Sequence, residues 1–339
     1  MKTIFVVDDN PVNLFAAKEV LSDQYKVITL SSASIMFEFL NNFLPDLILL
    51  DILMPEMDGF GALRRLRADK RYAKIPVIFL TSKNDAETEV LGFEMGVVDF
   101  ISKPFSGPVL LNRIKSHLHI ESIIHKRTEK LLRLQNGITS VLANMVEHRD
   151  KLTGNHIERT AAYLKILLDT MYEKKIYYND LRDWDVDIMI SAARLHDLGK
   201  IAVSDMILNK REKLTEDEFN TIKTHTSEGE KIIEGIIRET GDEDFLDSAK
   251  LFAGYHHERW DGLGYPRGLK GMDIPLQGRV MAIADVYDAL VSDRPYKKAF
   301  THEEAVEIIR DGRGTQFDPV IVDIFVEINE LFQMVAISR

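Results

Sequence analysis

Histidines and aspartates recur through the second half of the chain, several of them as adjacent pairs. The series is His156, His196-Asp197, His225, His256-His257 and Asp285. The chain has no cysteine, so any metal that it binds must be held by histidine and carboxylate side chains. Such mixed ligation suits Fe, Mn, Ni, Co or Zn, and the sequence does not choose among them. The segments around Asp197 and Asp285 are otherwise apolar, and burying these groups costs free energy unless they are paired or bind a cation.

The two oxygens of Asp197 can bridge two metal ions, with the histidines divided between the ions. Two metals about 3.5–4 Å apart suit phosphodiester hydrolysis, with a bridging water of lowered pKa as the nucleophile. A single histidine on a helix is more often structural than a ligand, but the HD and HH pairs weaken that alternative. Because neutral imidazole is the ligating form, activity is expected to fall as the pH drops below about 6.

The stretch YHHERWDGLGYP at 255–266 raises a geometric question. Adjacent side chains on a helix diverge by about 100°, so His256 and His257 cannot share one helical face. We therefore expect a helix to end at His256, with His257 in the irregular segment that follows, so that both rings face one ion. The glycines of this stretch permit tight turns and Pro266 stiffens its exit, which predicts a loop that forms one wall of a pocket.

A second set of polar residues lies at the ends of predicted strands in the first half. Asp8 and Asp9 follow the first strand and Asp51 ends the third, and Thr81 and Lys103 follow later strands. The carboxyl ends of strands in an open α/β sheet carry the site, and three gathered carboxylates suit Mg²⁺. Each acid taken singly is more often a solvated residue or a helix cap. Together they predict a phosphoryl-acceptor carboxylate, with Thr81 and Lys103 able to bind the added group.

The elements that must position these residues follow from periodicity. TIFVVDD, KVITL, DLILLD, PVIFLT and VVDFIS are strand-like and alternate with helical segments, which predicts a doubly wound, five-stranded parallel α/β domain over 1–120. Residues 121–145 are predicted to be a helical linker, and residues 146–339 an all-α domain. The linker pattern at Leu131, Leu134, Ile138, Val141 and Met145 fits either a coiled coil or a helix that packs on its own domain.

Bulk composition narrows the class of function. The 339 residues carry a net charge of −11, which disfavours wholesale binding to nucleic acid. No basic recognition helix, signal peptide or membrane-length apolar run is visible in the sequence. We expect a cytoplasmic, bacterial protein.

Residues 1–120 resemble the response-regulator receiver domain, through VVDDN, LLDILMPEMDG, FLTS and ISKPF. The resemblance implies that Asp51 is phosphorylated by a cognate sensor histidine kinase. It also implies that Asp8, Asp9 and Asp51 hold Mg²⁺ with the backbone carbonyl of Ile52 or Leu53. Thr81, Phe100 and Lys103 would then form the switch that reports phosphorylation, biasing the helix at 106–150.

Residues 140–335 resemble the HD-GYP subgroup of HD-domain phosphohydrolases, which hydrolyse cyclic di-GMP. The matching segments are DKLTGNH, HDLGKI, HT, HHERWDGLGYPRGLKGMDIPLQGR and ADVYDALVSDRPYKKA. The resemblance implies that the metal ligands are His156, His196, Asp197, His225, His256, His257 and Asp285. It also implies that Asp197 and Lys200 are catalytic, and that Asp150, Tyr265, Arg294 and Lys297 contact the substrate.

One position departs from some relatives, which carry a glutamate for a third metal where this chain has Leu152. We therefore expect a dinuclear site, which weakens the assignment of His156 and favours opening of the ring to linear pGpG over complete hydrolysis to GMP. Two alternatives remain open: a catalytically weak signalling adaptor, and a phosphodiesterase for another cyclic dinucleotide. Further expected partners are a second copy of the chain through the linker helix, and proteins that bind the GYP loop.

Overall fold

The computed structural model describes residues 1–82, 86–149, 155–210, 212–241, 244–293 and 298–337. The chain divides into two compact units, Met1–Leu131 and Leu132–Arg339. Each unit is built around its own hydrophobic core.

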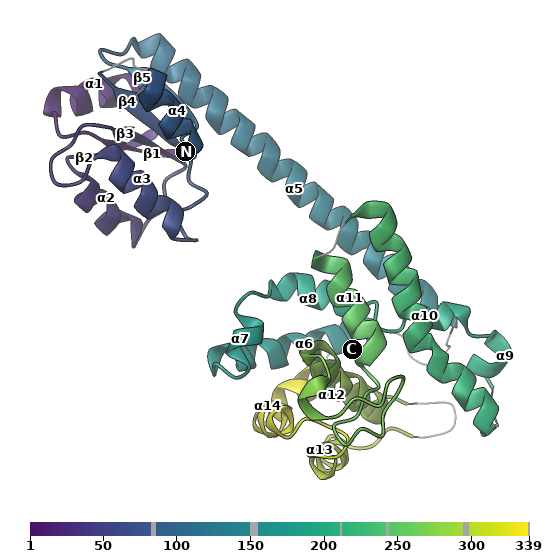
Figure 1. Cartoon of the computed structure of the whole chain (residues 1–339). Helices are drawn as coiled ribbons and strands as arrows, with labels where there is room; N and C mark the ends of the chain where they lie inside the picture. The colour runs from purple at the N-terminus through teal and green to yellow at the C-terminus, as the bar shows by residue number, and fades with distance from the viewer. Residues whose placement is uncertain (83–85, 150–154, 211, 242–243, 294–297, 338–339) are drawn as a thin grey trace. The chain divides into compact units, whose positions relative to one another are not determined.

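The first unit is a parallel sheet with helices on both faces (Figure 1). Its strands have the spatial order β2-β1-β3-β4-β5, and every neighbouring pair is parallel. The strands are β1 (Thr3–Val7), β2 (Lys26–Leu30), β3 (Leu47–Asp51), β4 (Val77–Thr81) and β5 (Asp99–Ser102). The helices between them are α1 (Pro11–Leu21), α2 (Ala33–Leu40), α3 (Gly59–Ala68) and α4 (Ala86–Glu94). The five-stranded α/β prediction is confirmed.

Burial on both faces explains why these strands read as continuous apolar runs. The side chains of β1, β3 and β4 are buried throughout. One face packs against α1 and the start of α5 (Gly107–Arg149), through Leu21, Leu110 and Ile114. The other face packs against α2 and α3, through residues such as Met36 and Leu63. Parallel sheets are stable when both faces are covered in this way.

Helix α5 is continuous over 43 residues and runs from the first unit into the second. In its second half, Thr139, Ala143 and Val146 are buried. The predicted a/d row lies on a different face: Leu131, Leu134, Ile138, Val141 and Met145 are all more than half exposed. The helix therefore packs on its own unit through the face of Ala143 and Val146, and the predicted a/d row is left exposed within the chain.

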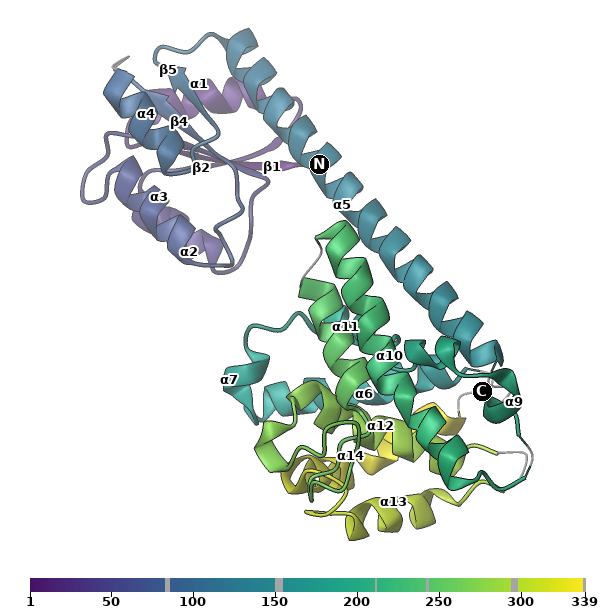
Figure 2. The same cartoon turned by 45° about the vertical axis from the view of Figure 1, so that its right-hand side comes forward.

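The second unit is helical (Figure 2). Its α-helices after α5 are α6 (His156–Glu173), α7 (Tyr178–Leu181), α8 (Val186–Ala193), α9 (Asp205–Leu208), α10 (Glu216–Thr240), α11 (Asp244–Tyr255), α12 (Leu276–Val291), α13 (His302–Asp311) and α14 (Pro319–Ile337). Two 3₁₀ helices are η1 (Leu198–Ala202) and η2 (Gly271–Asp273). The all-α prediction is confirmed, although the one-turn helices α7 and α9 are too short for periodicity to reveal.

Aromatic side chains tie α6, α12 and α14 into one core. Tyr163 of α6 stacks on Phe332 of α14, with ring centroids 4.8 Å apart, and meets Tyr287 of α12 edge to face at 5.1 Å. All three rings are fully buried, and aromatic pairs of this geometry contribute about 0.5–1.5 kcal/mol beyond the area that they bury. This packing holds α6 and α12 side by side, and both helices carry site residues. None of the helices in the described ranges combines the length and apolar composition needed to cross a membrane.

Candidate metal centre

Seven of the residues singled out in the sequence line one cavity of about 450 Å³ in the second unit: His156, Asp197, Lys200, His225, His257, Tyr265 and Asp285. They come from α6, the segment around η1, α10, the segment after α11, and α12. His196 and His256 lie behind them and are buried. The structure therefore brings together residues up to 129 positions apart, from His156 to Asp285, in one place.

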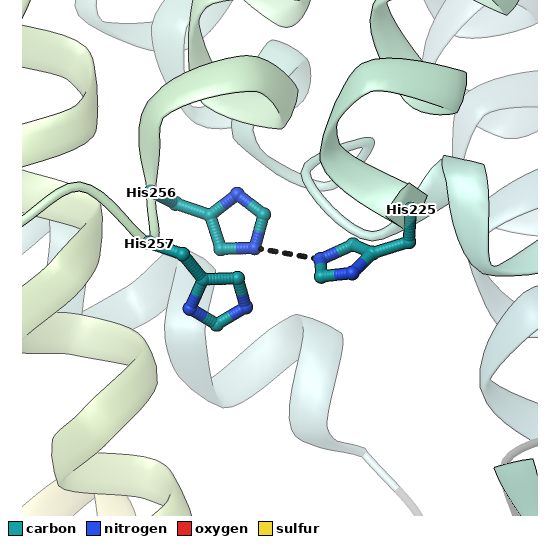
Figure 3. Close-up of side chains that lie close together, drawn as sticks. All are labelled: His225, His256 and His257. Carbon is teal, nitrogen blue, oxygen red and sulfur yellow. Dashed lines mark hydrogen bonds between the residues drawn. The ribbon is translucent and has the colours of Figure 1, made fainter. Parts of the chain in front are cut away.

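The rings of His225 and His256 face each other through their Nε2 atoms. Nδ1 of His225 lies 2.7 Å from the carbonyl oxygen of Ile222, and Nδ1 of His256 lies 2.9 Å from that of Phe252. A carbonyl oxygen only accepts hydrogen bonds, so each ring carries its proton on Nδ1. The two Nε2 atoms, which lie 3.3 Å apart (Figure 3), then present lone pairs to each other. Two facing lone pairs repel each other, and a cation bound between them would remove that repulsion. The donor set therefore fits a metal ion.

His257 completes this first ligand group. Helix α11 ends at Tyr255, so His256 and His257 both follow its last turn. Their ring centroids lie 4.1 Å apart, and Figure 3 shows both rings on the side that faces His225. Ligand atoms of His225, His256 and His257 lie within 4.8 Å of one another. The helix ends one residue earlier than expected, and both imidazoles still reach a single group.

A second group consists of His156, His196 and Asp285, whose ligand atoms also lie within 4.8 Å of one another. His196 donates from Nδ1 to the carbonyl oxygen of Ala193 at 2.9 Å, which leaves a lone pair on Nε2. That buried Nε2 has no hydrogen-bond partner among the described residues. A buried polar atom without a partner is costly, and a metal ion would satisfy it.

Asp197 lies between the two groups. Its Oδ1 is 3.5 Å from Nε2 of His225 and 3.8 Å from Nε2 of His256. Its Oδ2 is 3.4 Å from Nε2 of His196 and 2.8 Å from Nζ of Lys200. One oxygen thus faces each group, which is the geometry that a bridging carboxylate requires.

Electrostatics favour the metal-binding protonation state in most of these candidate ligands. Burial lowers the pKa of His225, lowers that of His256 strongly, and lowers that of His257 to about 3. Burial also opposes ionisation of Asp197, but Lys200 and the neighbouring histidines outweigh it and hold the pKa of Asp197 well below its usual range. His196 differs, because the charges of Asp197 and Asp285 outweigh its burial and raise its pKa.

The apolar surroundings of the HD dipeptide favour a helix, but the dipeptide lies in a turn. Helix α8 ends at Ala193, and His196-Asp197 form the turn that leads into η1. The segment after the dipeptide approaches the backbone of α10 closely. A Cβ on Gly199 would lie 1.8 Å from the carbonyl oxygen of His225, so η1 rests directly on α10. This contact places Asp197 against His225.

The GYP loop, which follows α11 and contains Gly264-Tyr265-Pro266, folds back on the end of that helix. The buried Glu258 accepts hydrogen bonds from the backbone N–H groups of Arg267 (2.7 Å) and Leu269 (3.0 Å). The backbone N–H of Tyr265 donates to the carbonyl oxygen of His257, and the two rings lie 4.7 Å apart. Gly264 is needed for close approach, since its Cβ would lie 2.3 Å from the backbone nitrogen of Arg259. The loop thereby holds Tyr265 as one wall of the cavity.

Some expected site residues cannot be placed, and others were missed. Asp150, Leu152, Arg294 and Lys297 lie outside the described residues. Asp288 and Arg159 were not singled out, although both contact the centre through His156 or each other. A signal was present, because each follows a predicted ligand by three residues on a helix, at the spacing that keeps side chains on one face.

The acidic site of the first unit forms at the predicted sheet edge. Ligand oxygens of Asp8, Asp9 and Asp51 lie within 4.8 Å of one another. Lys103 reaches across them, with Nζ 2.6 Å from Oδ2 of Asp8 and 2.8 Å from Oδ2 of Asp51. Burial raises the pKa of Asp51. Thr81 is buried at the end of β4, beside this edge.

Phe100 is buried on β5 between aromatic neighbours. Its ring centroid lies 5.6 Å from that of Phe79 and 5.1 Å from that of Phe93 on α4. The preceding residue, Asp99, pairs with Arg113 (2.5 Å) and His117 (3.1 Å) of α5. A side-chain connection therefore joins the strand that carries Phe100 to the long helix.

Comparison with known proteins agrees with both halves of this architecture. Residues 140–321 match the HD domain and residues 4–115 match the response regulator receiver domain. The chain therefore belongs to the HD-domain family, and it is a response regulator in which a receiver domain precedes that domain.

Three relatives carry informative names. A "Probable cyclic di-GMP phosphodiesterase" of Vibrio cholerae is 41% identical over 95% of this chain and 77% of the relative. The "Cyclic di-GMP phosphodiesterase response regulator RpfG" of Xanthomonas campestris pv. campestris is 37% identical over 82% of this chain and 74% of the relative. A "3'3'-cGAMP-specific phosphodiesterase 2" of Vibrio cholerae is 38% identical over 55% of this chain and 33% of the relative.

Proposed function

We propose that the chain is a metal-dependent cyclic di-GMP phosphodiesterase of the HD-GYP type, controlled by phosphorylation of its receiver domain. The observation that carries this proposal is the position of Asp197. Its two carboxylate oxygens face two separate groups of side chains that could bind metal. A bridged pair of divalent ions, when bound there, supplies an activated water and stabilises charge on the transferred phosphoryl group. The names of the two relatives that align over most of this chain support the choice of substrate.

The site residues have separate roles in holding each ion and in contacting the substrate. His225, His256 and His257 would hold one ion, His156, His196 and Asp285 the other, and Asp197 both. Lys200 lies on the cavity wall beside Asp197, where its ammonium group can polarise a phosphate oxygen. Tyr265 also lines the cavity, where its ring can stack on a guanine base. Asp150, Arg294 and Lys297, which lie outside the described residues, remain assigned to the substrate by sequence resemblance.

The experiment is metal analysis and cyclic di-GMP turnover for the wild type and Asp197→Ala. Two ions per chain and measurable turnover are expected for the wild type. Turnover should fall more than about a hundredfold in the variant, since loss of a mere partner of a ligand typically costs 10–100-fold. Asp247→Ala, which removes an exposed carboxylate paired with Lys250 on α11, is the control and should retain both properties. Unchanged turnover in Asp197→Ala refutes the mechanism.

The product is proposed to be linear pGpG. Leucine at position 152 cannot bind a third metal, which supports a dinuclear site and a single ring-opening cleavage. Chromatography of the products over the time course should show that pGpG accumulates. Rapid and complete release of GMP contradicts this part of the proposal.

A second candidate substrate is the mixed dinucleotide 3′3′-cGAMP. The similarity to a phosphodiesterase named for that substrate favours it specifically. The two substrates differ in one base, so Tyr265 and its neighbours on the cavity wall would decide between them. Parallel kcat/KM measurements on both dinucleotides separate the candidates.

We propose that the receiver site controls the enzyme through Asp51. Phosphorylation of Asp51 by a sensor histidine kinase, with Mg²⁺ held by Asp8, Asp9 and Asp51, would shift Lys103 and engage Thr81 and Phe100. The contacts of Asp99 with Arg113 and His117 support a path from β5 to α5. Turnover with and without a beryllofluoride adduct tests this, and equal rates would contradict control of catalysis.

We propose that the exposed a/d row of α5 contacts a second copy of the chain. The row from Leu134 to Met145 is apolar and exposed over three helical turns, a pattern typical of a coiled-coil face. Light scattering should report a dimer for the wild type and a monomer for Ile138→Glu. A monomeric wild type contradicts the proposal.

A further inference from the structure

The ring of His156 lies between two aspartates of the same helix. Its Nε2 is 3.5 Å from Oδ1 of Asp285, in the second ligand group. Its Nδ1, on the opposite side of the ring, is 2.7 Å from Oδ2 of Asp288. The two aspartates are three residues apart on α12 and therefore share one face. The two nitrogens of His156 thus face a candidate metal ligand on one side and a buried carboxylate on the other.

Asp288 is buried and accepts hydrogen bonds from several side chains. Its side chain is 1% exposed. Arg159, one turn after His156 on α6, donates from Nε to Oδ1 at 2.6 Å and from Nη2 to Oδ2 at 2.9 Å. The hydroxyl of Ser292 lies 3.4 Å from Oδ2. Two parallel hydrogen bonds from a guanidinium group are the geometry of an arginine–carboxylate ion pair, so Asp288 serves as a charged acceptor.

The hydrogen-bond acceptor of His156 Nδ1 differs in kind from those of three other histidines in the centre. His196, His225 and His256 each donate from Nδ1 to a backbone carbonyl oxygen within their own helix or turn. Such an acceptor is fixed by the local fold. The acceptor of His156 is a side chain from another helix, 132 residues away. The orientation of His156 therefore depends on a residue that can be changed without altering the backbone.

We infer that Asp288, braced by Arg159, is the positioning residue that makes His156 a metal ligand. By accepting the Nδ1 proton, Asp288 fixes the tautomer in which the Nε2 lone pair points toward Asp285 and His196. A carboxylate partner also makes the imidazole a stronger donor to a cation. This inference rests on the proposed dinuclear centre, and it assigns His156 to the second ligand group despite Leu152.

Metal affinity of each group gives a readout that a purely structural role would not move. The full-length protein is stripped of metal and titrated with Zn²⁺ against a chromophoric chelator. Two binding events per chain are expected for the wild type. Asp288→Asn should weaken one event about 10–100-fold and leave the other unchanged. His156→Gln should weaken the same event, and His257→Gln the other one.

Two further variants distinguish a selective loss of metal affinity from a general loss of stability. Asp323→Asn removes an exposed carboxylate that accepts from Arg313 through the same pair of donors, at 2.7 and 2.8 Å, and should leave both events unchanged. Asp288→Asn strands the buried charge of Arg159, so the variant can unfold. The double variant Arg159→Met/Asp288→Asn removes the whole ion pair and should show the same selective weakening. Equal weakening of both events, or of neither, overturns the inference.

The outcome is independent of the substrate. Selective weakening in a protein whose wild type leaves cyclic di-GMP intact would support the positioning role and refute the proposed function. Turnover by the wild type with unchanged Zn²⁺ affinity in Asp288→Asn would do the reverse.

Discussion

Gly199→Ala tests whether the contact between η1 and α10 builds the metal centre. Gly199 lies between Asp197 and Lys200 in sequence and presses against the backbone of α10. An added Cβ would lie 1.8 Å from the carbonyl oxygen of His225 and 2.4 Å from the backbone nitrogen of Gly229. Neither atom belongs to a side chain that can rotate away. The substitution must therefore move η1 and α10 apart.

The size of the effect follows from these distances. Ordinary contact begins near 3.4 Å, so relieving a 1.8 Å approach requires a shift on the order of 1.5 Å. Overpacking of this kind typically costs 1–3 kcal/mol, and a rigid backbone contact belongs at the upper end, about 3 kcal/mol. The same shift carries Asp197 away from His225, and a misplacement of about 1 Å can cost roughly a hundredfold in rate.

The assay compares urea unfolding, Zn²⁺ content and turnover. Gly235→Ala on α10 and Gly137→Ala on α5 are the controls, because their added Cβ atoms meet no atom closer than 4.0 Å. Each control should raise the free energy of unfolding by up to about 1 kcal/mol, the helix-propensity gain of alanine over glycine. A Gly199→Ala protein as stable and as metal-rich as the wild type would refute the reasoning.

Three further predictions follow from the site. In the metal-free, unfolded chain His257 binds a proton below about pH 6.5, but burial lowers its pKa to about 3 in the folded chain. Between these pH values the unfolded chain therefore binds more protons, so the free energy of unfolding should fall as the pH drops. His257→Gln should flatten that fall in urea unfolding at pH 7 and pH 4.5, and an unaltered slope would contradict the assignment. Glu258→Gln replaces one carboxylate oxygen with an NH₂ group, so one loop N–H would face another hydrogen-bond donor. The KM for cyclic di-GMP should therefore rise about tenfold or less, with metal content unchanged. Loss of metal would instead mean that Glu258 supports the candidate ligands. Lys103→Met should weaken the response to a beryllofluoride adduct on Asp51 without changing basal turnover, and an intact response would contradict the role of Lys103.

The strands and long helices were predictable because burial imposes simple periods on the sequence. Strands covered on both faces, such as VIFLT at 77–81, become continuous apolar runs. The all-α half followed equally well from helical spacing. The short helices α7 and α9 were not predictable, since four residues span only one turn.

The position of the HD dipeptide was not predictable from local pattern. The segment SAARLHDLGKI is apolar enough to continue α8, yet the helix ends at Ala193. The segment that follows contacts the backbone of α10 at Gly199, and the two contacting segments are more than twenty residues apart in sequence. A tertiary contact of this kind overrides helix propensity, which is a weak local preference.

The list of candidate ligands could be read from the sequence, but their grouping could not. Residue type and spacing predict that His225 and Asp197 belong to a candidate metal centre. Which histidines share an ion depends on where the helices end and on which ring nitrogen carries the proton. The hydrogen bond to the carbonyl oxygen of Ile222 places the proton of His225 on Nδ1, and the hydrogen bond to Asp288 does the same for His156. The chemistry of the centre is therefore set by hydrogen bonds made behind the ligands, and those bonds appear only once the helices are packed.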